Sequence, residues 1–170
     1  ENRSLFDRCI MGFNSGPPMV SATYNNNVMI FQAPGYVTIL NEMVHNARVI
    51  PIGDGTDKPP FSQYSGVSRG HYEGNTLVVE TTQFKGGQSR GTGPNMHLIE
   101  RFTRVDPDTV AYEFTVTDDT VYVVPYTALM PLRRTDDDLF EYACHEGNIG
   151  MHGILAGARK LESEGRELRR

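Results

Sequence analysis

Glu100 is the residue of this chain best placed for acid–base chemistry. It lies in an alternating run, 96–105, whose neighbouring same-face positions are apolar. A carboxylate on an apolar face is costly unless it is paired. Two hypotheses follow: a structural acid paired with an arginine such as Arg48 or Arg104, or a cavity acid whose raised pKa suits proton transfer.

His145 and Glu146 are the alternative acid–base candidates, and together with His97 they are the weak candidates for a metal site. Imidazole nitrogen and carboxylate oxygen are common metal ligands. However, the spacing matches no HExxH or HxH motif, and adjacent residues on a strand point to opposite faces. We therefore predict no metal site. The glycine-containing stretches 53–57 and 89–93 do not connect a strand to a helix as a phosphate loop does, so no cofactor is predicted.

The aromatic residues could form a pocket for an apolar or aromatic ligand, because such pockets combine ring surfaces with a few polar groups. The candidate ligand-binding residues are Tyr72, Phe102, Tyr112, Phe114 and Tyr142.

Two hairpins should position these side chains. Gly74 and Asn75 form a two-residue turn between β-like runs, which places Arg69 opposite Glu80. A turn at 106–108 joins runs 96–105 and 109–118 and places Arg101 opposite Glu113. The alternation there predicts an antiparallel strand pair with one buried face, which holds Glu100.

Other segments complete the predicted architecture. A hairpin with His45 and Asn46 as its turn should join runs 36–44 and 47–52, and a last hairpin should join 126–133 to 139–144. Asn148 is a suitable N-cap for a C-terminal helix.

These elements predict an all-β, mainly antiparallel fold of one domain, residues 1–170. We expect an N-terminal arm (1–27), an up-and-down, lipocalin-like β-barrel of about eight or nine strands (28–146) and a C-terminal α-helix (148–168). A β-sandwich is the alternative.

Charge and hydropathy exclude some classes of function. The net charge is −5 and the basic residues are scattered, which argues against a nucleic-acid partner. No apolar run approaches the length of a membrane span. Cys9 and Cys144, near the two ends, could be two buried thiols or one disulfide.

Three stretches resemble a large family of secreted bacterial proteins of unknown function: GVSRGHYEGNTLVVETTQF, ERFTRVDPDTVAYEFTVTDD and EYACHEGNIGMHGILAGAR. The family pattern has WEGDTLVV where this chain has YEGNTLVV, and often a Trp near Tyr64. Here both positions are Tyr, which would alter any pocket that these rings line.

The resemblance implies a secreted or periplasmic protein, a Cys9–Cys144 disulfide, and a chain that is the C-terminal portion of a longer precursor. It implies no activity, because the family itself is uncharacterised.

Three functions are compatible with these observations. The first is a β-barrel that binds a small, mostly apolar or aromatic organic ligand. The second is a cofactor-free acid–base enzyme (a lyase, isomerase or hydrolase) that uses the barrel cavity. The third is an assembly or interaction module with a solid interior, whose arm or helix contacts a neighbour, including a homo-oligomer.

Overall fold

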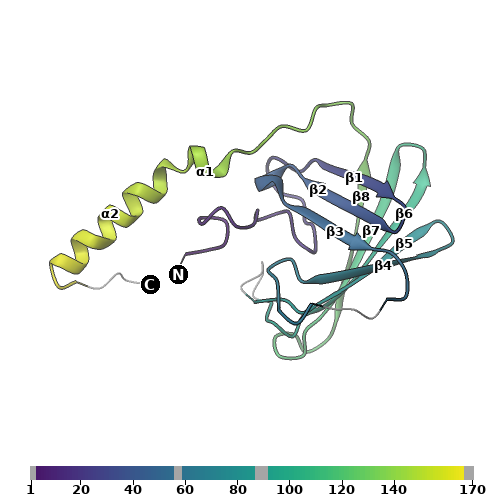
Figure 1. The fold of residues 1–170 in the computed structure, drawn as a ribbon, viewed down its shortest axis with the longest axis horizontal. Coiled ribbons are helices and arrows are strands. Elements are labelled where there is room, and N and C mark those ends of the chain that lie inside the picture. Colours follow the sequence, from purple (N-terminus) through teal and green to yellow (C-terminus); the bar gives the residue numbers. More distant parts are fainter. Residues whose placement is uncertain (1–2, 56–58, 87–91, 167–170) are drawn as a thin grey trace.

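The computed structural model describes residues 3–55, 59–86 and 92–166 and forms two antiparallel sheets (Figure 1). The small sheet has the order β1-β2-β3, with β1 at Val28–Ala33, β2 at Tyr36–Asn41 and β3 at Ala47–Pro51. The large sheet has the order β4-β5-β6-β7-β8. Its strands are Val67–Glu73, Thr76–Thr82, His97–Asp106, Thr109–Thr117 and Tyr126–Arg133.

The two sheets do not close into a barrel, so the all-β prediction is confirmed and the barrel prediction is wrong. A sandwich-like arrangement, the predicted alternative, fits better. β3 and β4 are connected by an isolated parallel bridge between Ile52 and Gly70, and β8 does not pair with β1. Two prolines contribute to this lack of pairing between the sheets. Pro51 ends β3 and Pro131 lies in β8, and neither has a backbone N–H to donate to a further strand.

The two strongest hairpin predictions are confirmed. Gly74 has a φ of 60°, as the tight turn requires, and Arg69 pairs with Glu80. Arg101 pairs with Glu113 in the next hairpin, and a register shift between Arg104 and Asp106 accommodates its turn.

The hairpin between runs 36–44 and 47–52 is confirmed as the antiparallel pair β2–β3, but its predicted two-residue turn is wrong. β2 ends at Asn41, and a short 3-10 helix, η1 (Met43–His45), replaces the tight turn at His45 and Asn46. The prediction of a last hairpin is wrong: in the described part of the chain no strand follows β8, and the segment 139–143 is irregular. The alternation of apolar and polar residues there did not specify a strand, because no neighbouring edge pairs with it.

The core lies between the sheets. Its largest fully buried side chains come from both sheets and adjoining loops: Tyr112, Phe84, Ile39, Met43, Ile50, Met96, Leu98 and Glu100. The arm adds Met19 to this core.

The C-terminal segment forms α1 (Cys144–Gly147) and α2 (Ile149–Ser163). The Asn148 side chain accepts a hydrogen bond from the Met151 N–H at 3.1 Å, so the predicted N-cap is confirmed. The helix is shorter than the predicted 148–168, whose last two positions lie outside the described residues. α2 extends away from both sheets and has no buried residue (Figure 1). Neither α-helix in the described part of the chain is long and apolar enough to cross a membrane.

Candidate functional site

Glu100 lies on the inner face of β6, fully buried, where it pairs with Arg48 of the opposite sheet. The Arg48 guanidinium donates two hydrogen bonds, Nη1 to Oε2 at 2.5 Å and Nη2 to Oε1 at 3.0 Å. Arg48 reaches this position because β3 alternates its side chains, with Arg48 and Ile50 on the inner face. Burial by itself would lower the pKa of Arg48, but the Glu100 carboxylate outweighs this effect and raises that pKa above its ordinary value.

Tyr112 extends this pair into a network. Its hydroxyl donates to Glu100 Oε1 at 2.7 Å and accepts a hydrogen bond from the Met19 N–H at 3.0 Å. Burial and the negative charge of Glu100 raise the pKa of Tyr112 well above its ordinary value. The network therefore joins β3, β6, β7 and the arm.

This geometry supports the structural hypothesis for Glu100. Both carboxylate oxygens are occupied by donors and have no exposed surface from which to reach a ligand. Arg104, the other predicted partner, donates instead to the carbonyls of Asp106 and Pro107 at the hairpin end.

The other polar candidates lie outside the buried network of Glu100. His145 and Glu146 are exposed on α1, outside the two sheets. His97, on the outer face of β6, contacts the Glu80 carboxylate at 2.7 Å. Within 3–55, 59–86 and 92–166, no group of three metal-binding side chains is present.

The five aromatic candidates do not gather around one hollow. Phe102, Tyr112 and Phe114 stack in the core, with ring centroids 4.8 and 5.6 Å apart. Tyr72 is exposed at the rim and its hydroxyl accepts a hydrogen bond from Gln32 at 2.7 Å. Tyr142 packs against the arm, on Phe6 and Tyr24.

Cys9 and Cys144 form a disulfide, as the resemblance implied. The arm and α1 meet there, and the Asn148 side-chain amide donates to the Asp7 carbonyl at 3.0 Å. The EYACHEGN stretch therefore attaches the C-terminal segment to the arm.

One hollow lies where β3 and β4 diverge, a cleft of about 860 Å³. One side carries the outward side chains of β3, Ala47, Val49 and Pro51, which we call the apolar wall. The other side carries Arg69, His71 and Glu80, which we call the charged wall. Sequence reasoning missed this cleft. The available signal was the run ARVIPI, which is apolar on both faces except at Arg48.

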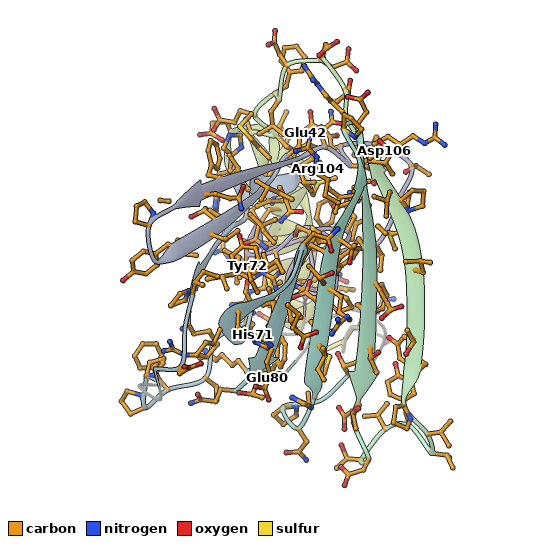
Figure 2. All side chains as sticks on the ribbon, turned by 90° about the vertical axis from the view of Figure 1, so that its right-hand side faces the viewer. Glu42, His71, Tyr72, Glu80, Arg104 and Asp106 are labelled. Atoms are coloured by element: carbon orange, nitrogen blue, oxygen red, sulfur yellow. A yellow bond between two sulfur atoms is a disulfide. The ribbon has the colours of Figure 1, made fainter. Side chains whose placement is uncertain are left out.

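Contacts from neighbouring segments hold the charged wall in place. Glu80 lies opposite Arg69 in the ladder, and the Arg69 guanidinium approaches the Gly53 carbonyl at 3.5 Å. His71 and Glu80 lie on the same side of the β4–β5 hairpin (Figure 2). The cleft thus has preformed polar groups, a common property of ligand sites.

A second hollow of about 630 Å³ lies between the edges of β1 and β8. Its lining is largely apolar and includes Met29, Ile30, Met130 and Leu132.

The chain matches no protein-family model, and comparison with curated proteins and with solved structures gave no significant match. The resemblance to the secreted bacterial family therefore stays a prediction.

Proposed function

We propose that this protein binds a small organic molecule with an apolar or aromatic body and a polar end, in the cleft between β3 and β4. The observation that carries this proposal is that the apolar wall and the charged wall line the same hollow. Its volume of about 860 Å³ falls within the usual range for small-molecule sites.

The binding site therefore differs from the lumen expected of a barrel. The space between the sheets is filled by the core, whereas the cleft opens to solvent beside it. The body of the ligand would lie on Val49 and Pro51, and its polar end would meet His71 and Glu80. An enzyme that uses Glu100 is not proposed, because that carboxylate has no exposed surface.

The proposed location is outside the cytoplasm, in the periplasm or the medium. The Cys9–Cys144 disulfide supports this location, because such bonds persist in oxidising compartments.

The test uses 1-anilinonaphthalene-8-sulfonate, a fluorescent probe with an aromatic body and an anionic end, with native mass spectrometry for co-purified ligands. Val49→Asp should weaken probe binding at least tenfold, because it places a carboxylate in the apolar wall. Val105→Asp is the matched control, since both valines are 58% exposed and Val105 does not line the cleft.

Equal binding by the wild type, Val49→Asp and Val105→Asp would contradict the proposal. So would a wild-type protein that binds no probe and carries no co-purified molecule.

An assembly module is the second candidate function, favoured by the exposed apolar side chains of α2. Ile149 and Leu155 are 82% and 47% exposed, and the helix surface at Gly150, Gly153 and Gly157 faces open space. Deleting the residues after 148 would abolish any oligomer held by α2. An unchanged mass distribution by analytical ultracentrifugation would exclude that role.

A further inference from the structure

β1 borders the small sheet, and within the described residues no strand pairs with its outer edge. The Glu42 N–H donates to the Asn27 carbonyl at 2.9 Å, at the start of the β1–β2 ladder. Hydrogen-bonded pairs alternate along an antiparallel ladder, so the odd-numbered residues of β1 bond to β2. The backbone N–H and C=O groups of Val28, Ile30 and Gln32 therefore point away from the sheet.

The border of the large sheet at β8 is protected. The Arg134 N–H donates to the Asp108 carbonyl at 2.8 Å, which continues the β7–β8 ladder. The even-numbered residues of β8 thus bond to β7, and Pro131 and Arg133 face the free edge. A proline without an N–H and a charged side chain both discourage strand addition.

β1 has neither form of protection. Its sequence, VMIFQA, contains no charge and no proline. Met29, Ile30 and Phe31 are 41%, 38% and 48% exposed. An uncharged apolar edge of this kind favours pairing with another strand.

We propose that two copies of this chain pair through β1, antiparallel and about a two-fold axis at Ile30. Ile30 then lies opposite Ile30 of the second copy, and Val28 lies opposite Gln32. The two small sheets become one sheet of six strands.

The choice of a second copy follows from the pattern of β1 itself. Val28, Ile30 and Gln32 are the residues whose backbone groups point away from the sheet. An antiparallel register centred on Ile30 is the one that pairs all three of them with one another. It also places Met29 beside Phe31 of the second copy, a sulfur–aromatic contact that favours association. β1 itself carries no charge, so the two paired strands bring no charged side chains of their own together.

Sedimentation velocity of the full chain tests the association. The wild type should sediment as a dimer, and Ile30→Asp should sediment as a monomer because two carboxylates would meet at the axis. Val105→Asp adds the same charge away from β1 and should remain dimeric.

Val49→Asp separates edge pairing from stacking of the apolar outer faces of the small sheets. It should also remain dimeric, since Val49 lies on β3 at the opposite border of the small sheet. A monomeric wild type at all concentrations would overturn the proposal, as would a dimer that Val49→Asp dissociates and Ile30→Asp does not.

Cross-linking tests the register without relying on a destabilised variant. Residues opposite each other in a hydrogen-bonded pair have Cα atoms about 5.5 Å apart, within the range that a disulfide spans. Under mild oxidation Ile30→Cys should form a covalent dimer, whereas Gln32→Cys should form far less, because it faces Val28. Equal cross-linking of the two variants would overturn the register and with it the proposal.

This inference is independent of the proposed ligand site. Val49→Asp should weaken probe binding at least tenfold and leave the dimer intact, whereas Ile30→Asp should dissociate the dimer and leave probe binding unchanged. Either proposal can therefore fail while the other stands.

Discussion

The two faces of the large sheet both carry pairs of acidic and basic side chains, but in opposite surroundings. On the inner face, Glu100 is fully buried and pairs with Arg48 of the other sheet. On the outer face, Glu73 pairs with Arg101 at 2.7 Å in contact with water. The buried ion pair should therefore hold the two sheets together. The exposed ion pair should contribute little to stability, because solvent screens exposed charges.

Removing one partner of the buried pair should have the largest effect. Arg48→Met leaves the Glu100 carboxylate buried without its cation and should lower the free energy of unfolding by about 3–5 kcal/mol. Urea denaturation measures this change.

The double variant Arg48→Met with Glu100→Leu sharpens the comparison. Replacing a whole buried pair by apolar side chains is often nearly neutral, so it should recover most of the lost stability. A double variant as unstable as Arg48→Met would show that the ion pair itself stabilises the fold. The loss in Arg48→Met would then not come from an unpaired buried charge.

Removing the disulfide tests whether the arm contributes as much as the interior pair. Cys9→Ser with Cys144→Ser should lower the free energy of unfolding by about 2–4 kcal/mol, since the bond closes a long loop. Denaturation with and without reductant measures it. If this loss of stability exceeded that of Arg48→Met, the disulfide would contribute more than the buried ion pair, contrary to the expected order.

Tyr112→Phe should lower the free energy of unfolding by about 1–3 kcal/mol, because the Met19 N–H loses its acceptor inside the core. The folded-state pKa of Tyr112 is raised, so its contribution is complete below the ordinary tyrosine pKa and is lost as pH rises above about 10. Alkaline denaturation profiles of the wild type and Tyr112→Phe should therefore converge above that pH. Parallel profiles would contradict the link between ionisation of Tyr112 and stability.

Arg101→Met repeats the first substitution on the outer face and should leave the melting temperature almost unchanged. Hydrogen bonds from Arg101 and His71 lower the pKa of Glu73. The contribution of Glu73 is thus present above the ordinary glutamate pKa and is lost as pH falls through the lowered one. NMR titration of the Glu73 carboxyl should show that pKa rise in Arg101→Met. A loss of stability like that of Arg48→Met would remove the distinction between the faces.

The sequence by itself determined the local pairings of this protein. The turn at Gly74 and Asn75 and the alternation along 96–116 specified two registers and placed Glu100 on the buried face, because a strand alternates its side chains with a period of two. The Asn148 cap was equally local.

Tertiary structure alone decided which distant segments meet. Glu100 had two possible cations, and the packing of the sheets brought Arg48 to it while Arg104 remained at the hairpin end. Whether the strands closed into a barrel, and whether 139–144 formed a strand, depended on edges far away in the sequence, which local alternation does not encode. The cleft arose for the same reason: Val49 and Arg69 face one hollow because β3 and β4 diverge after a single bridge.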